Sequence, residues 1–173
     1  MLVLGVLGLV AGGVGEEGPF GSMKRYSAET FSVSVPSDFN ERLGNKGIQD
    51  GYEYRTYYGE ALDKRPITVY VASSTDAKKN LKTAAQALAQ KIAKNTNGDY
   101  KQLSVGESEL ALKGSQEIRF SFTNLRNHST LGVVAYGRSG GTDVTVTILY
   151  PTTAQTIVES EVIGRVLKSI QID

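Results

Sequence analysis

Apolar and polar residues alternate through most of the chain, which is the period of half-buried β-strands. The alternation predicts strands at residues 31–35, 52–58 and 67–73, a fourth strand region within 99–112, and three neighbouring antiparallel strands between Ser115 and Pro151. Gly140 and Gly141 predict a tight hairpin between the last two strands. The first three strands are expected to form one wing of the sheet, and the glycine-containing stretch 41–50 is interpreted as a loop.

In two segments the spacing of apolar residues changes to that of an α-helix. In residues 77–95 the apolar positions follow the i, i+3, i+4 rule, and one of the residues Ser73 to Asp76 is expected to cap the helix. Residues 154–169 carry a wide apolar stripe, with Thr152 or Thr153 as the expected cap. Two amphipathic helices and a predominantly antiparallel sheet predict a layered α+β fold.

The first 22 residues differ from the rest. Met1 to Val14 is apolar and glycine-rich, follows no Lys or Arg, and is shorter than the roughly 20 residues that a membrane-spanning helix needs. Residues 1–22 are interpreted as a fused or vector-derived segment outside the fold, and residues 23–173 as a single domain. A truncated natural leader, or a genuine part of the fold, is the alternative.

Composition excludes several kinds of chemistry. The 173 residues include no cysteine and one histidine, so disulfides, zinc ribbons and thiol catalysis are excluded. A net charge of +1 argues against a nucleic-acid partner. His128 has no expected ligand partner, and Glu107 and Glu109, on one face of a strand, are interpreted as solvent-facing. No catalytic residue, metal site or cofactor is predicted, and the chain is expected not to be an enzyme.

Two groups of side chains are candidates for binding. Lys79, Lys82 and Lys94 lie opposite the apolar stripe of the first helix, where they form a basic surface for an acidic partner or an anionic membrane, or else a solvated face. The second group consists of tyrosines that form either cross-strand packing or an interface patch. Its members are Tyr52, Tyr54, Tyr57 and Tyr58.

The order of elements resembles the PsbP-like superfamily, which includes PsbP, the Ran-binding Mog proteins and bacterial DcrB-type lipoproteins. The segments that carry the resemblance are Phe31 to Phe39, Gly114 to Phe122, Gly132 to Tyr150 and Val166 to Ile170. The resemblance covers about residues 26–173. It implies an α/β/α sandwich with a central antiparallel sheet, two main helices and no catalytic centre.

The resemblance also implies a function. Members of the superfamily act by binding proteins, so a non-enzymatic accessory domain of the bacterial envelope, with a protein or peptide partner, is the leading hypothesis. The alternative is a cytoplasmic chaperone similar to the Eag type, which shields apolar transmembrane segments of secreted effectors. Under either hypothesis the apolar segment 1–14 is a candidate to pack on its own or a neighbouring molecule.

Overall fold

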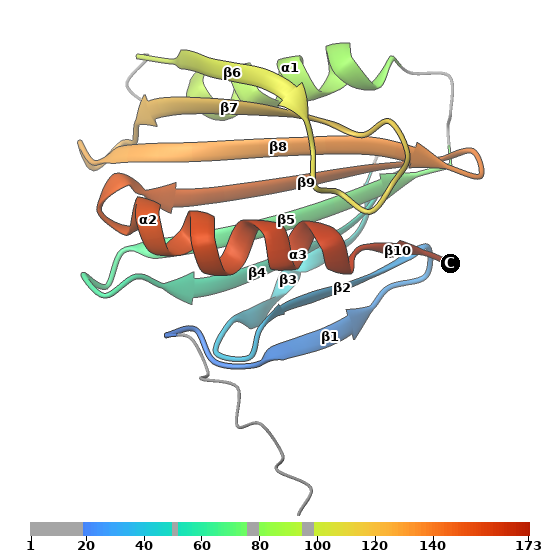
Figure 1. The fold of residues 1–173 in the computed structure, drawn as a ribbon, viewed down its shortest axis with the longest axis horizontal. Helices are drawn as coiled ribbons and strands as arrows, with labels where there is room; N and C mark the ends of the chain where they lie inside the picture. The colour runs from blue at the N-terminus through green and yellow to red at the C-terminus, as the bar shows by residue number, and fades with distance from the viewer. Residues whose placement is uncertain (1–18, 50–51, 76–79, 95–98) are drawn as a thin grey trace, which may run out of the picture.

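The structure is a computed structural model that describes residues 19–49, 52–75, 80–94 and 99–173, and its strands form two sheets (Figure 1). The strands are β1 (Met23–Ser27), β2 (Phe31–Pro36), β3 (Asn40–Gln49), β4 (Tyr52–Glu60), β5 (Pro66–Ser74), β6 (Lys101–Glu107), β7 (Gln116–Thr123), β8 (Ser129–Ser139), β9 (Thr142–Pro151) and β10 (Gln171–Ile172). The helical segments are α1 (Leu81–Lys94), the 3-10 turn η1 (Thr152–Ala154), α2 (Gln155–Val158), the π-helical η2 (Glu159–Ile163) and α3 (Gly164–Ser169).

The larger sheet has the order β3-β4-β5-β9-β8-β7-β6, and all its neighbouring strands are antiparallel. Strands β3 to β5 and strands β6 to β9 are each joined in sequence order, and the pairing of β5 with β9 connects the two groups. The hairpin between β8 and β9 turns at Gly140 and Gly141, whose φ angles are 56° and 89°. The predicted three-stranded stretch and its glycine hairpin are therefore confirmed.

Two predictions about strands are wrong. Residues 41–50 were expected to form a loop, but β3 pairs with β4 there, with a register shift between Glu41 and Lys46 that interrupts the ladder. An edge strand tolerates glycines at such an irregularity. Strand β2 does not share a sheet with β4 and β5, because it pairs with β1 and β10 in a separate three-stranded sheet.

The helices cover opposite faces of the larger sheet. Along β8, Val133 and Ala135 belong to the core that contains α2 and α3, whereas Val134 and Tyr136 belong to a second core beneath α1. Because successive side chains of a strand point to opposite faces, the two cores lie on the two sides of the sheet. The α+β class and the α/β/α arrangement are confirmed (Figure 1).

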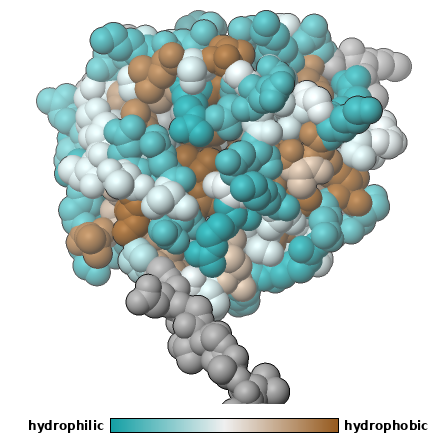
Figure 2. Space-filling view, viewed as in Figure 1, coloured by the Kyte–Doolittle hydropathy of each residue, from teal (hydrophilic) through white to brown (hydrophobic). Residues whose placement is uncertain are grey.

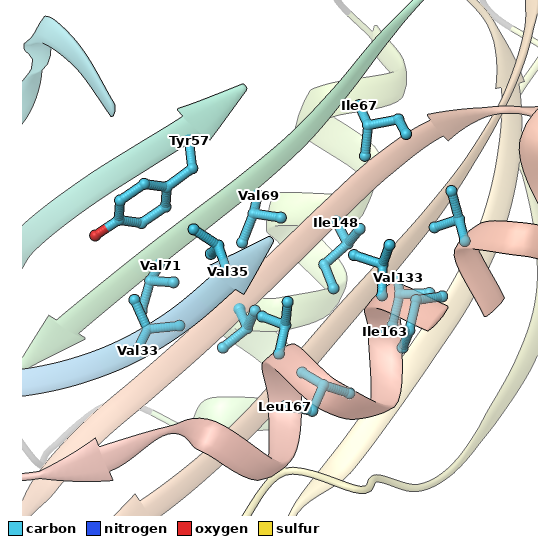
Figure 3. Close-up of a cluster of buried hydrophobic side chains, with 14 of the residues drawn as sticks. Val33, Val35, Tyr57, Ile67, Val69, Val71, Val133, Ile148, Ile163 and Leu167 are labelled. Carbon is cyan, nitrogen blue, oxygen red and sulfur yellow. The ribbon is translucent and has the colours of Figure 1, made fainter. Parts of the chain in front are cut away.

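The larger core lies between the sheet and a layer formed by α2, α3 and the small sheet (Figure 3). Val33 and Val35 of β2 face β5, and Leu167 of α3 completes the same cluster. Ser169 ties the layer together, because its Oγ accepts a hydrogen bond from the Ser34 amide at 2.8 Å. Its hydroxyl lies within donating distance of two carbonyls, that of Val166 in its own helix at 2.7 Å and that of Ser34 at 3.2 Å. The small sheet thus packs beside α3 as part of one covering layer.

The predicted helix caps differ from those observed. Helix α1 begins at Leu81, and Asn80 caps it by accepting a hydrogen bond from the Thr83 amide at 3.2 Å. Ser73 and Ser74 belong to β5, and Asp76 lies outside the described residues. The two threonines before α2 make no side-chain cap. The Thr153 hydroxyl instead donates to Asp63 at 2.6 Å.

The folded chain begins earlier than expected. Phe20 is only 6% exposed and packs edge-on against Phe39, with 6.1 Å between ring centroids. The division between residues 22 and 23 therefore moves toward the N-terminus, while residues 1–18 lie outside the described residues and their origin stays a prediction. Within the described residues, no helix has the length and apolarity needed to cross a membrane.

Candidate functional site

Helix α1 covers only part of its face of the sheet. It packs on β7 and β8 through Ala85 and Ala89, whose small side chains are buried against an aromatic and apolar floor. Leu81 and Leu88 remain only partly buried, because they lie at the flank of the helix that is turned toward β4 and β5. A groove therefore runs between the helix and the other half of the sheet.

This groove, which we call the tyrosine groove, has a volume of about 430 Å³. Its floor comes from β4, β5 and β9, and its wall comes from α1. The lining residues are Tyr52, Tyr54, Tyr70, Ala72, Leu81, Ala84, Ala87, Leu88, Lys91, Asp143 and Thr145. Aromatic and aliphatic side chains with a few polar groups are typical of a binding site.

Two tyrosines of the groove form a stack across neighbouring strands. The rings of Tyr54 and Tyr70 lie 6.0 Å apart at an interplanar angle of 25°. Burial, followed by the proximity of Tyr54, raises the pKa of the Tyr70 hydroxyl, so it keeps its proton at neutral pH. The pair presents a rigid surface with hydroxyl groups that can donate hydrogen bonds.

Charged residues stand at the two sides of the groove. Lys91 lines its helical wall, and Lys82 and Lys94 are exposed elsewhere on α1. Asp143 also lines the groove, but it is 5% exposed and bidentate with Arg138. The side chain that offers a charge to a ligand is therefore Lys91. Lys79 lies outside the described residues.

The structure separates the four predicted tyrosines. Tyr52 and Tyr54 lie together in the groove, whereas Tyr57 faces the larger core, where it is 1% exposed and 4.8 Å from the ring of Tyr26. Tyr58 lines a different cavity, and the Arg42 guanidinium lies 4.7 Å from its ring centroid. Tyr57 is thus a core residue, not part of an exposed tyrosine patch.

Tyr70 is a groove residue that sequence reasoning missed. The alternation of β5 places Ile67, Val69 and Val71 in the core, and all three are fully buried. The same alternation puts Tyr70 on the opposite face, beside Tyr54. The alternation in the sequence therefore indicates the face on which Tyr70 lies, but not that Tyr54 is its neighbour. That contact follows from the pairing of β4 with β5, which sets Tyr54 opposite Ala72 and Thr56 opposite Tyr70.

A group of ionisable side chains on the other face ties η2 to the sheet. Arg119 pairs with Glu117 at 2.6 Å and with Glu159 at 3.7 Å, and the Tyr150 hydroxyl donates to Glu159 at 3.0 Å. Burial, with the charge of Glu159 second, raises the pKa of Tyr150. None of these residues lines a cavity described here, so the group is interpreted as structural.

The structure also shows where the other ionisable residues considered in the sequence lie. Glu109 pairs with Lys168 at 3.2 Å, while Glu107 is exposed at the end of β6. His128 lies in the turn between β7 and β8, where its amide donates to the Asn124 side chain at 3.0 Å. Among the described residues, no group of three His, Cys, Asp or Glu side chains could hold a metal ion.

The described residues on the face that α2 and α3 cover form a mixed surface. Figure 2 shows this face as predominantly hydrophilic, with apolar residues in separate patches. Another cavity formed by described residues, of about 690 Å³, lies at one end of the molecule and is lined by turn residues such as Leu62, Asp63 and Lys64. The tyrosine groove differs from this cavity in that a stacked pair of tyrosines lies in its floor.

Comparison with solved structures identifies the fold. Cyanobacterial PsbP (CyanoP) from Synechocystis sp. PCC 6803 is similar with a TM-score of 0.57 and 16% identity, over 98% of this chain and 99% of that chain. A point mutant of the protein Mog1 gives a TM-score of 0.55 and 16% identity, over 87% and 96% of the two chains. LpqN, involved in cell envelope biogenesis of Mycobacterium tuberculosis, gives 0.51 and 11%, over 87% and 91%.

These similarities show that the chain has the PsbP/Mog1/DcrB-like fold, which confirms the resemblance found in the sequence. At 11 to 16% identity the comparison concerns the fold alone. No family model and no curated protein matches the sequence.

Proposed function

We propose that the protein is a non-enzymatic accessory domain of the bacterial cell envelope that binds another protein through the tyrosine groove. The observation that carries the proposal is the open half of the sheet beside α1, where Tyr54 and Tyr70 form a stacked pair next to Leu88. Tyrosine is enriched in the central contacts of protein interfaces because its ring buries a large area at low entropic cost. The envelope location draws support from the similarity in fold to LpqN.

The chemistry of the groove indicates the kind of partner. Apolar side chains fit between the tyrosine rings and the Leu81–Leu88 flank of α1, and Lys91 favours an acidic residue beside them. Lys82 and Lys94, exposed on the same helix, extend the positive potential along it. The partner is therefore a protein segment with apolar anchors and a nearby carboxylate.

The groove fits a transmembrane segment less well, which places the chaperone hypothesis second. A 20-residue helix is about 30 Å long and about 10 Å across, so it fills roughly 2,000 Å³. The tyrosine groove, at about 430 Å³, holds a few side chains of such a helix. Titration with a 20-residue apolar peptide, with and without residues 1–18 of the protein, separates the two functions: saturable binding in the groove supports the chaperone.

The proposal is tested by crosslinking followed by affinity measurement. A photo-reactive phenylalanine at position 54 should crosslink to the protein partner, and Tyr54→Ala should then weaken its binding about tenfold or more, because a central aromatic contact is lost. Tyr58→Ala is the matched control, since Tyr58 lies on the same strand but lines another cavity. Equal losses for the two variants, or no loss for Tyr54→Ala, would contradict the proposal.

A further inference from the structure

Two strand connections at one end of the molecule carry exposed leucines. Leu62, between β4 and β5, is 91% exposed, and Leu125, between β7 and β8, is 75% exposed; these are the highest values among large apolar side chains in the described residues. The antiparallel order of the sheet brings both turns to the same end, as Figure 1 shows. We call this end the leucine end.

A basic groove separates the two turns. It has a volume of about 560 Å³, and its lining includes Arg42, Lys64, Arg65 and Arg126 but no carboxylate. Lys64 and Arg65 are partly neutralised, because Lys64 lies 3.6 Å from Glu60 and Arg65 lies 2.8 Å from Asp63. Arg42, whose guanidinium lies over the ring of Tyr58, and Arg126 make no ion pair within the described residues, so no carboxylate in contact neutralises either charge.

The combination of exposed leucines with a basic groove distinguishes the leucine end from an ordinary protein surface. A single exposed leucine needs no explanation, and a solvated cation needs none either. Two leucines on projecting turns, with cations set between them, match the boundary of an anionic bilayer, where apolar side chains enter the interface and Arg and Lys meet headgroup phosphates. A soluble anion would use the arginines and leave both leucines without a role.

The position of the N-terminal part of the chain also supports a membrane as the binding partner of the leucine end. Pro19, the first described residue, lines a cavity together with Leu62 and Lys64, so the described chain starts at the leucine end. The sequence ahead of it contains the apolar run Met1 to Val14. The most apolar part of the sequence is therefore tethered to the end that carries the exposed leucines.

We propose that the leucine end docks on an anionic phospholipid bilayer, with Leu62 and Leu125 entering the interface and Arg42 and Arg126 binding headgroup phosphates. The tyrosine groove has none of these four residues in its lining. Membrane docking is thus independent of the proposed protein binding, and each can fail without the other.

Co-sedimentation with vesicles tests the proposal on the whole chain. The protein should bind vesicles of 30% phosphatidylglycerol in phosphatidylcholine, and bind pure phosphatidylcholine far more weakly. The double variant Leu62→Ser, Leu125→Ser should weaken binding at least about tenfold, because both leucines leave the interface. Arg42→Gln with Arg126→Gln should cost about tenfold on the anionic vesicles and remove much of the salt dependence.

Control variants test whether vesicle binding depends on the leucine end. Leu103→Ser changes a leucine on β6 that is 55% exposed, and it should alter binding less than twofold. Far-UV circular dichroism confirms that each variant is folded. If the leucine variants bind vesicles like the parent, residues 1–18 alone would account for binding, and the proposal is overturned. It is also overturned if the arginines bind inorganic phosphate, or a glutamate-rich peptide, without vesicle binding.

Discussion

At Gly132 in β8 the ring of Phe120 from the neighbouring strand lies directly over the backbone. A Cβ atom added there would overlap that ring, which is itself fully buried beneath α1. Gly132→Ala should therefore lower the free energy of unfolding by about 1–3 kcal/mol, since the aromatic ring has to move within a packed core. Urea denaturation measures the change.

Gly106 provides the matched control for that experiment. It also lies within a strand, but nothing stands within 4 Å of an added Cβ atom, and its φ angle is not positive. Gly106→Ala should leave the stability within about 0.5 kcal/mol of the parent. Similar effects of the two substitutions would show that the ring of Phe120 does not restrict Gly132.

The period of the sequence identified many individual core residues correctly. Val33 and Val35 alternate with serines in the strand predicted at residues 31–35, and both are fully buried. The same alternation sets Tyr57 on the face opposite Tyr54, but its burial could not be inferred, because a tyrosine suits an interface as well as a core. Alternation thus gives the face of a residue, and the packing of the whole chain decides whether that face is covered.

Between elements, Glu53 anchors the small sheet to the large one. Its carboxylate, on β4, accepts hydrogen bonds from the amides of Glu29 and Thr30, both at 2.9 Å, and from the Thr30 hydroxyl at 2.8 Å. Burial alone would raise the pKa of Glu53, but these bonds, with the charge of Arg55, outweigh it and lower the pKa. The turn between β1 and β2 is therefore held by an ionised carboxylate.

The lowered pKa predicts an effect of pH on stability. The contribution of Glu53 is complete above the ordinary glutamate value of about 4.3 and is lost as the pH falls through the lowered folded value. Glu53→Gln should cost about 1–3 kcal/mol at pH 7, because two amides lose a charged acceptor. The difference from the parent should shrink below about pH 4. Thermal unfolding at pH 7 and pH 3.5 checks this, and a constant difference would contradict it.

The sequence predicted some strands of the fold correctly and missed others. The strands between Ser115 and Pro151 were found because each alternates clearly and glycines mark the last hairpin. Strand β3 was missed because its sequence, NERLGNKGIQ, shows no alternation and its edge position requires only one partner. Strands β1 and β10 were missed because they are short and depend on β2 for their hydrogen bonds.

For the whole molecule, the arrangement of layers defines the proposed function. One layer, of α2, α3 and the small sheet, covers the larger core, while α1 covers only the β7 and β8 side of the opposite face. This difference leaves the tyrosine groove open. The sequence predicts both helices, but the position of α1 across the sheet follows from which strands pair, and period alone cannot give that.

Hydrogen–deuterium exchange of the protein with and without its crosslinked partner tests the central claim most directly. If the tyrosine groove binds the partner, exchange should slow in residues 52–54, 70–72 and 81–91, which supply its floor and wall. Residues 155–169, on the opposite face, should exchange as in the free protein. Protection centred on residues 155–169, with the groove unchanged, would contradict the account.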